Sequence, residues 1–260
     1  MNIIEGRVKR PYKIVIYGPE GIGKSTMASK AEDALFIDLE AGTDQMNVKR
    51  VGSPRTWEEL ITTVKEIAGM PDICKSVVID TADRCEVLCA QYICRRQNIP
   101  SIESLGYGKG YTILQEQFQK LLNALDTVIA SGKNVIVAAH AKMRKQELPD
   151  EAGAFDRWEM KLTRQVAPLL KEWTDALLFL NYKTFVVTTA DDTRKAQGGR
   201  RVIYTSHHPC WDAKNRHELP EVLNLDAAGV AELYKRLDGF VKEKKEGKDM
   251  SQQKKAVINY

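Results

Sequence analysis

A glycine-rich segment between an apolar run and a helical pattern constrains this chain more than any other feature. Residues 13–17 (KIVIY) are mostly apolar and β-branched, which predicts a buried strand. Residues 18–25 (GPEGIGKS) fit the pattern G-x-x-x-x-G-K-[ST], and a helical stretch follows to residue 31. Strand, glycine-rich loop and helix in this order are typical of a phosphate-binding loop, or P-loop. An incidental glycine-rich turn is the alternative.

Each residue type in this segment has a chemical role. The glycines allow backbone N–H groups to wrap around a β-phosphate, and the start of the following helix adds the positive end of its dipole. We expect Lys24 to reach the β- and γ-phosphate oxygens and the Ser25 hydroxyl to bind Mg²⁺. The predicted cofactors are therefore ATP and Mg²⁺. The predicted nucleotide contacts are Gly18, Pro19, Glu20, Gly21, Ile22, Gly23, Lys24, Ser25 and Thr26.

Apolar and helical segments alternate over the first 140 residues. Strands that are apolar throughout are buried on both faces, and alternation with helices favours parallel pairing. The sequence therefore predicts an α/β fold with a mostly parallel central sheet flanked by helices. The expected strands are 13–17, 35–39, 76–79 and 134–139, and the expected helices are 56–68, a segment ending near 96, and 113–130.

The pattern changes after residue 140. Residues 141–161 are polar without periodicity, which predicts a loop. Beyond them we expect a short helix at 163–172, a strand at 176–180, an antiparallel edge hairpin from 184–190 and 200–205, and a final helix at 226–246. No linker divides the chain, so we expect one domain at 1–246 with an N-terminal arm at 1–12, followed by a flexible tail at 247–260.

Charged or polar residues follow three of the predicted strands. Asp80 comes directly after an apolar strand, at the carboxyl edge of the sheet where ligands collect, and we expect it to hold Mg²⁺ with Ser25. Asp83 competes for this role, and Asp80 has a second possible role as a helix N-cap. Glu40 and His140 are candidates for orienting the attacking water and sensing the γ-phosphate. A surface glutamate and an ordinary loop histidine are the alternatives.

Taken in order, the P-loop, Glu40, Asp80 and His140 resemble the RecA-like recombinase ATPases. In that family the glutamate activates water, and a polar residue after the fourth strand, usually Gln, couples the γ-phosphate to a DNA-binding loop; here that residue is His140. The chain also looks like the compact phage-encoded, single-strand-annealing recombinases of AAA type that keep only the ATPase core. This resemblance covers residues 11–226 and rests on 18–26, 105–111 (LGYGKGY), 138–140 (AAH) and 213–216 (AKNR).

The resemblance implies further sites. Two loops of these recombinases hold single-stranded DNA, and by chain order they correspond to residues 95–111 and 141–161. The latter segment holds five basic and five acidic residues, so an ordinary solvated loop is the alternative. Lys214 and Arg216 are implied to reach the γ-phosphate of a neighbouring subunit, the alternative being that they cap Asp212 or Glu218. The implied DNA contacts are Arg95, Arg96, Lys109, Lys142, Arg144 and Lys145.

The net charge averages two unlike parts of the chain. The whole sequence has 39 basic and 35 acidic residues, a formal charge of +4 that does not by itself indicate a nucleic-acid-binding protein. Residues 18–90 hold 8 basic and 13 acidic residues, so the positive excess lies in the arm, the hairpin, the AKNR segment and the tail. Elements of this kind face a polyanion or a neighbouring subunit.

The cysteine count and the hydropathy of the sequence indicate where in the cell the protein is expected. The chain has five cysteines, an odd number that does not indicate a disulfide framework. It has no run of eighteen apolar residues and no signal-peptide pattern, so we expect a cytoplasmic protein, in the host cytoplasm for a phage, without membrane contact. For the histidines and cysteine at 207–217, a zinc site is the alternative to ordinary packing.

Three functions fit these features. The first is an ATP-hydrolysing, RecA-like recombinase that assembles head to tail as a ring or filament on single-stranded DNA and promotes annealing or strand exchange. The second is another P-loop enzyme, a nucleotide kinase or a DNA-packaging motor. The third is a non-hydrolysing, nucleotide-dependent loader or mediator. The partners expected for the first are single-stranded DNA, further copies of the chain and a single-strand-binding protein.

Overall fold

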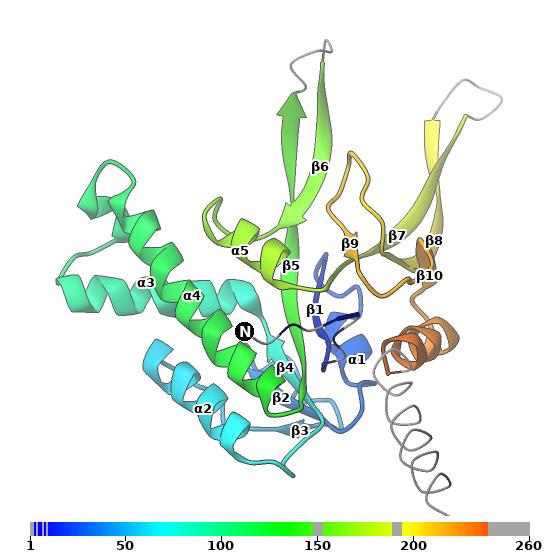
Figure 1. Cartoon of the computed structure of the whole chain (residues 1–260). Coiled ribbons are helices and arrows are strands. Elements are labelled where there is room, and N and C mark those ends of the chain that lie inside the picture. Colours follow the sequence, from blue (N-terminus) through cyan, green and yellow to red (C-terminus); the bar gives the residue numbers. More distant parts are fainter. Residues whose placement is uncertain are drawn as a thin grey trace, which may run out of the picture.

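A central sheet with helices on both faces forms the body of the molecule (Figure 1). The computed structural model describes residues 3, 5, 6, 8, 10–147, 153–188 and 194–238, with the backbone alone at 184–188 and 194–197. Predictions for residues 239–260 lie outside the described residues. The strands are β1 (Lys13–Gly18), β2 (Ala34–Asp38), β3 (Lys49–Arg50), β4 (Ser76–Asp80), β5 (Asn134–Glu147), β6 (Ala154–Met160), β7 (Ala176–Thr188), β8 (Arg194–Tyr204), β9 (Lys214–Asn215) and β10 (Val222–Asn224). The helices are α1 (Lys24–Ala28), α2 (Trp57–Gly69), α3 (Ala82–Gln97), the 3₁₀ helix η1 (Ile102–Leu105), α4 (Lys109–Ala130), α5 (Val166–Trp173) and residues 227–238.

The ten strands named above belong to one sheet, in the order β10-β8-β7-β1-β5-β4-β2-β3. The strands from β7 to β3 in this order run parallel, whereas β8 and β10 continue the β7 edge antiparallel. β6 pairs with β5, and β9 pairs with β7. The predicted fold class, a mostly parallel sheet flanked by helices with an antiparallel C-terminal edge hairpin, is confirmed.

Two apolar cores cover the two faces of the sheet. Val15 and Tyr17 of β1 pack in the core beneath α2, α3, α4 and α5. Ile14 and Ile16 of the same strand pack in the core beneath α1 and the helix at 227–238. All four side chains are fully buried, because neighbouring residues of a strand point to opposite faces and both faces are covered. This double burial explains why the central strands are apolar without interruption.

Residues 141–147 and 154–160 pair as a β-hairpin, and the prediction of a loop is wrong for these residues. β5 continues past the parallel sheet and pairs antiparallel with β6, from Ala141 opposite Met160 to Glu147 opposite Ala154. The hairpin projects from the body (Figure 1), and most of its side chains are exposed or half-buried. A ribbon without a buried face carries no apolar alternation in its sequence, so periodicity does not reveal it.

The glycine- and tyrosine-rich segment at 105–111 turns the chain between α3 and α4. Gly106 and Gly108 have φ angles of 64° and 75°, which glycine adopts without strain. At Gly110 a Cβ atom would lie 2.0 Å from the Ile102 carbonyl oxygen. After this turn α4 begins at Lys109, four residues earlier than predicted.

Among the described helices, none combines the length and the apolar character that a membrane span needs.

Candidate nucleotide-binding and catalytic site

The register of the parallel strands brings the predicted site residues to one edge of the sheet. Gly18 at the end of β1 pairs with His140 of β5. Asp80 of β4 pairs with Asp38 of β2 and with Ala138 of β5. Glu40, two residues beyond Asp38, therefore reaches the level of Gly18 and His140. This is the carboxyl edge of the sheet, where open α/β folds bind their ligands.

The P-loop requires glycine at three of its positions. Gly18 lies so close to β7 that a Cβ atom would be 2.4 Å from the Leu180 carbonyl oxygen. Gly21 and Gly23 have φ angles of 71° and 112°, in the left-handed region that favours glycine. The loop then enters α1, where the Met27 N–H donates to the Gly23 carbonyl oxygen at 2.9 Å. Backbone of this kind can direct several consecutive N–H groups at one anion.

Lys24 lies at the centre of this loop and is only 6% exposed. Its ammonium group donates to the carbonyl oxygens of Gly18 and Pro19, at 3.1 and 2.9 Å. Burial lowers the pKa of Lys24, and the nearby Asp80 carboxylate opposes this effect. A phosphate on the loop would offer the ammonium group charged oxygen acceptors, which form stronger hydrogen bonds than neutral carbonyls.

Ser25 and Asp80 face each other across the site. The Ser25 hydroxyl donates to Asp80 Oδ2 at 2.6 Å. Burial raises the pKa of Asp80, and the hydrogen bond from Ser25 opposes this shift. A hydroxyl and a carboxylate oxygen are the hard donors that Mg²⁺ prefers, so the pair fits the predicted metal site. The N-cap of α3 is Thr81, whose side chain accepts from the Arg84 N–H, so Asp80 does not have that role.

Glu40 is oriented by two neighbours in the fold. The Thr81 hydroxyl donates to Glu40 Oε1 at 2.8 Å. Asp38 orders the loop that carries Glu40, because its carboxylate accepts from the backbone N–H groups of Glu40, Gly42 and Thr43, at 3.0, 3.3 and 2.8 Å. Burial alone would raise the pKa of Asp38, but these bonds and one from the Thr43 hydroxyl hold it below its usual value. The Glu40 carboxylate is thereby held at the sheet edge.

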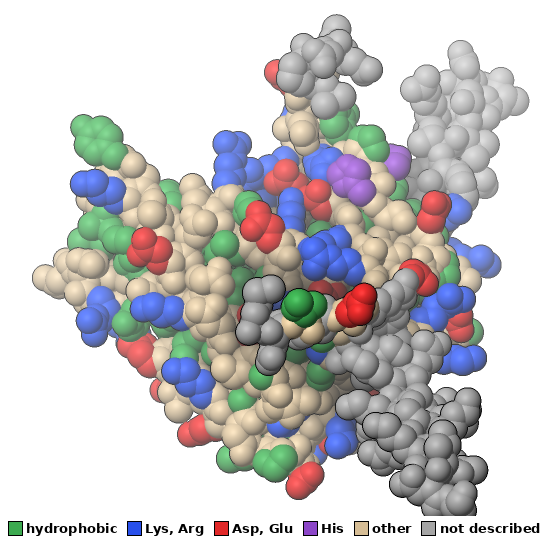
Figure 2. Space-filling view, viewed as in Figure 1, with side chains coloured by type: hydrophobic (Ala, Val, Ile, Leu, Met, Phe, Trp, Pro, Cys, Tyr) green, Lys and Arg blue, Asp and Glu red, His purple; other side chains and the backbone are tan. Residues whose placement is uncertain are grey.

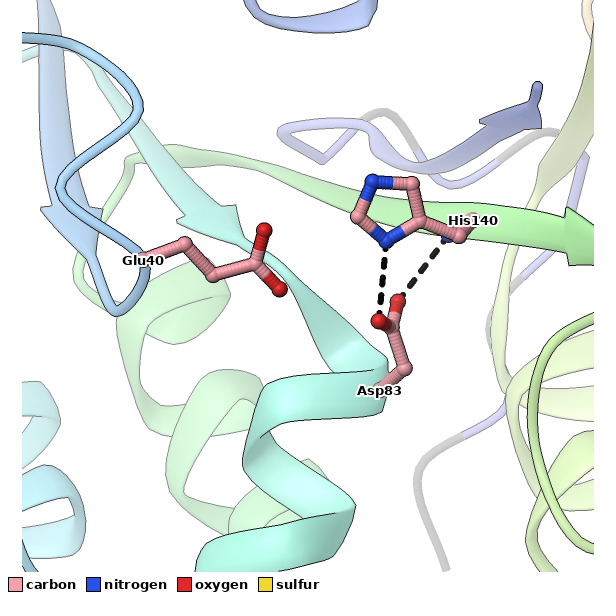
Figure 3. Close-up of side chains that lie close together, drawn as sticks. All are labelled: Glu40, Asp83 and His140. Carbon is pink, nitrogen blue, oxygen red and sulfur yellow. Dashed lines mark hydrogen bonds and ion pairs between the residues drawn. The ribbon is translucent and has the colours of Figure 1, made fainter. Parts of the chain in front are cut away.

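His140 is paired with Asp83 at the start of α3 (Figure 3). His140 Nδ1 lies 2.9 Å from Asp83 Oδ2, and the His140 backbone N–H donates to Asp83 Oδ1 at 3.0 Å. The hydrogen bond to this carboxylate raises the pKa of His140, although burial opposes it. The other ring nitrogen points away from Asp83 (Figure 3). Ligand atoms of Glu40, Asp83 and His140 lie within 4.8 Å of one another, so one small ligand can contact all three.

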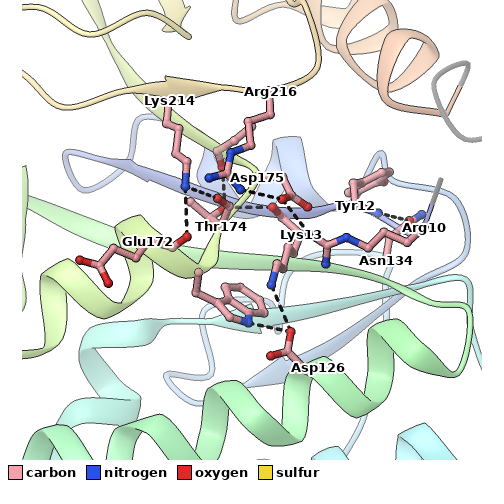
Figure 4. Close-up of polar contacts among 12 residues, drawn as sticks. Arg10, Tyr12, Lys13, Asp126, Asn134, Glu172, Thr174, Asp175, Lys214 and Arg216 are labelled. Atoms are coloured by element: carbon pink, nitrogen blue, oxygen red, sulfur yellow. Dashed lines mark hydrogen bonds and ion pairs between the residues drawn. The ribbon is translucent and has the colours of Figure 1, made fainter. Parts of the chain in front are cut away.

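Lys214 and Arg216 lie at the opposite edge of the sheet (Figure 4). β9 pairs with the first residues of β7, so Lys214 and Asn215 lie level with Val15 and Ile14 of β1, about 10 and 13 Å along the strand from Gly18. Lys214 Nζ donates to the carbonyl oxygens of Lys171, Glu172 and Thr174, at 2.9, 3.1 and 2.6 Å. Arg216 lies 3.5 Å from the Asp175 carboxylate. Within one protomer neither residue joins the nucleotide site.

The six predicted DNA contacts fall into two groups. Arg95 and Arg96 belong to the last turn of α3, and Lys109 begins α4. Arg95 forms an ion pair with Glu58 of α2 at 3.1 Å, between two side chains that are more than half exposed. Lys142, Arg144 and Lys145 lie on β5 in the hairpin. Lys142 Nζ donates to the Leu162 carbonyl oxygen at 2.5 Å, and Arg144 pairs with Glu159 at 3.4 Å.

A basic cavity lies where the hairpin meets the start of α4. It has a volume of about 410 Å³. Its cationic lining residues are Lys142, Arg144, Lys161 and Arg164, and Tyr111 of α4 also lines it. Glu86 of α3 also lines the cavity, and it accepts hydrogen bonds from the N–H and hydroxyl groups of Thr163, another lining residue. Lys and Arg side chains gather beside the hairpin with some acidic side chains among them (Figure 2). Of the six predicted DNA contacts, Lys142 and Arg144 line this cavity.

A P-loop at the end of a central parallel strand, facing carboxylates at the ends of two neighbouring strands, defines this protein as a P-loop NTPase. Within that class, the chain belongs to the family described as AAA domain, whose model matches residues 10–217. No curated protein matches the chain.

The chain is also similar to several solved structures. The RadB recombinase has 14% identity and a TM-score of 0.45, over 85% of this chain and 90% of that chain. A KaiC-like protein from the archaeon Pyrococcus horikoshii OT3 has 12% identity and a TM-score of 0.46, over 84% and 86%. The flagellar accessory protein FlaH from Methanocaldococcus jannaschii has 11% identity and a TM-score of 0.42, over 84% and 85%.

Several residues of the site were not identified from the sequence. Thr81 and Asp38 orient Glu40, and Lys161 and Arg164 line the basic cavity. Asp83 is separated from His140 by 57 positions, so no local pattern predicts their pairing. Thr81 does carry a signal, because a threonine just before an apolar helix is a common N-cap.

Proposed function

We propose that this chain is a RecA-like ATPase that assembles head to tail on single-stranded DNA and promotes annealing or strand exchange in phage recombination. The observation that carries the proposal is the position of β5. Its buried part ends at Ala139, the next residue His140 lies beside the P-loop and Glu40, and the same strand continues directly into the hairpin that carries Lys142, Arg144 and Lys145. A shift of β5 caused by a bound γ-phosphate would therefore move the hairpin.

Each side chain at the carboxyl edge of the sheet has its own role in the proposed hydrolysis. Glu40 would accept a proton from the attacking water, and Lys24 would offset charge that develops on the transferred phosphoryl group. His140 would contact the γ-phosphate through the ring nitrogen that faces away from Asp83. Ser25 and Asp80 would hold Mg²⁺, which when bound offsets phosphate charge.

Self-assembly is supported by the position of the two C-terminal cations. Lys214 and Arg216 lie at the opposite sheet edge from the P-loop, so a head-to-tail contact can bring them toward the nucleotide of the next protomer. Such an interface is heterologous and produces a ring or a filament. For this role Lys214 must exchange its three carbonyl partners at the end of α5 for phosphate oxygens.

The decisive test measures ATP hydrolysis with and without single-stranded DNA while particle size is followed by light scattering. We expect DNA to raise kcat by about 5- to 150-fold, the factor that corresponds to a coupling of about 1–3 kcal/mol between two sites. We also expect the particles to grow when ATP and DNA are both present. A monomeric protein whose turnover ignores DNA would contradict the recombinase proposal. Phosphoryl transfer to a nucleotide acceptor in place of water would favour a kinase.

The hairpin cations give a more local prediction. Replacing Arg144 and Lys145 together with Ala should weaken binding of single-stranded DNA about tenfold at low salt. It should also lower the slope of log K against log salt by about 1.4, since each phosphate contact on a single strand contributes about 0.7. Fluorescence anisotropy over a salt series measures both quantities.

The matched control replaces Lys65 and Lys120 with Ala, which removes two exposed cations from α2 and α4. This control should leave the salt slope within error of the unmodified protein. An equal loss of affinity in both double variants would mean that total charge, and not the hairpin, governs DNA binding.

A further inference from the structure

Asp83, in the first turn of α3, holds His140 at two points. Its Oδ1 accepts from the His140 backbone N–H at 3.0 Å, and its Oδ2 lies 2.9 Å from Nδ1 of the ring (Figure 3). Both side chains are largely buried, each with 15% of its surface exposed. One carboxylate therefore fixes the β5 backbone at His140 and the orientation of the imidazole ring together.

The charge of Asp83 decides which nitrogen of the ring is protonated. Burial alone would raise the pKa of Asp83, but the hydrogen bonds from the His140 side chain and backbone hold it below its usual value, so the carboxyl group is ionised at neutral pH. An ionised carboxylate only accepts hydrogen bonds, and Nδ1 must therefore carry a proton. In an imidazolium ring Nε2 carries a proton too and can donate to a phosphate oxygen. In a neutral ring Nε2 has only a lone pair, which repels that oxygen.

α3 holds the chain on both sides of the hairpin. At the β5 side, Asp83 binds His140, whose carbonyl oxygen accepts from the Lys161 N–H just beyond β6, at 2.7 Å. One turn further along α3, Glu86 accepts from the Thr163 N–H at 3.0 Å. The two carboxylates thus anchor the two ends of the hairpin, but only Asp83 also binds the ring that faces the sheet edge.

We infer that Asp83 is a positioning residue, which orients His140 so that Nε2 meets a γ-phosphate and which ties this contact to the β5 backbone at the base of the hairpin. The inference rests on the proposed function, in which His140 contacts the γ-phosphate, and it adds the group that sets the orientation and protonation of the ring. Loss of Asp83 should therefore remove a response to the γ-phosphate while the P-loop still binds a diphosphate.

The first test compares the binding of ADP and of ATPγS, the thiophosphate analogue of ATP, both with Mg²⁺, by calorimetry on the full chain. The ratio of the two Kd values gives the preference for ATPγS. Asp83→Ala should lower this preference about tenfold, because a hydrogen bond to a charged group is worth roughly ten- to a hundredfold in affinity. The Kd of ADP should change less than about twofold.

The matched control is Glu86→Ala. It removes a largely buried carboxylate from the next turn of the same helix and releases the other end of the hairpin, without touching the His140 ring. We expect this variant to keep the preference of the unmodified protein. An equal fall in both variants would assign the effect to the packing of α3 and overturn the role of Asp83.

A pH series separates the protonation of His140 from a loosened fold. The hydrogen bond to Asp83 raises the pKa of His140 and burial opposes it, while the charges of Lys24 and Glu40 lower and raise it. The preference for ATPγS in the unmodified protein should fall as the pH rises through this raised pKa. Asp83→Asn keeps the size of the side chain and removes its charge, so the fall should be centred at least about one pH unit lower. A preference that fell at the same pH in both proteins would overturn the inference.

Histidine labelled with ¹⁵N reports the ring without any nucleotide. The chain has four histidines, and His140→Gln identifies the signals of this one. At about pH 9 the neutral ring should carry its proton on Nδ1 in the unmodified protein and share it between both nitrogens in Asp83→Ala.

The outcomes distinguish the inference from the proposed function. An Nδ1 without a proton in the unmodified protein, or equal binding of ADP and ATPγS by it, would overturn the role of Asp83. Unmodified protein that binds neither nucleotide would overturn the proposed function as well.

Discussion

Replacing Glu40 with Gln should lower kcat for ATP hydrolysis by about 10²- to 10⁴-fold while ATP still binds. A positioned general base contributes about this factor, and an amide cannot accept a proton from water at neutral pH. The substitution keeps the size of the side chain, and the amide oxygen can still accept from the Thr81 hydroxyl. Turnover measured by phosphate release, with ATP affinity measured separately by calorimetry, separates chemistry from binding.

The control for this variant is Asp44→Asn in the same loop. Asp44 is exposed and lies four residues beyond Glu40, so the change removes one negative charge near the site without touching its hydrogen bonds. We expect its kcat to stay within about twofold of the unmodified value, since an exposed charge is well screened. If Glu40→Gln turned over ATP as fast as Asp44→Asn, another group would have to activate the water.

The parallel core could be predicted because each of its strands is buried on both faces. Residues 13–17, 35–39, 76–79 and 134–139 are mostly apolar for that reason, and all of them except Leu39 lie in strands. The residues at the carboxyl edge of the sheet could also be predicted, since parallel strands in register bring the residues at their carboxyl ends to one level. Glu40, Asp80 and His140, each predicted to follow a strand, are therefore neighbours at this edge, although Asp80 ends β4 and His140 lies within the longer β5.

Features that depend on long-range contacts could not be predicted in the same way. The β5–β6 hairpin has no continuous buried face, and β3 and β9 have two residues each, too few for any periodicity. The partners of Lys214 are carbonyl oxygens at the end of α5, which carry no sequence signal at all. The family resemblance implied a role for Lys214 toward phosphate, whereas the contacts it makes within the protomer are with carbonyl oxygens at the end of a helix.

Replacing Lys24 with Met should weaken the binding of ADP and ATP about 100-fold. The ammonium group is the cation predicted to contact the terminal phosphates, and a loss of about 2.7 kcal/mol corresponds to this factor. Methionine has a similar length and an apolar end, so it occupies the buried position of Lys24 without a charge. The change thus removes the cation from the P-loop and leaves the three glycine positions untouched.

Thermal or urea unfolding in the presence of ADP measures this loss without any assay of turnover. At an ADP concentration 100 times the Kd of the unmodified protein, ligand binding should add about 2.7 kcal/mol to the free energy of unfolding. At the same concentration the Lys24→Met variant should gain only about 0.4 kcal/mol, because the concentration then equals its Kd. Lys65→Met, which removes an exposed lysine on α2, should gain as much as the unmodified protein. If ADP stabilised the Lys24→Met variant as much as the unmodified protein, the terminal phosphates would have to bind elsewhere on the molecule.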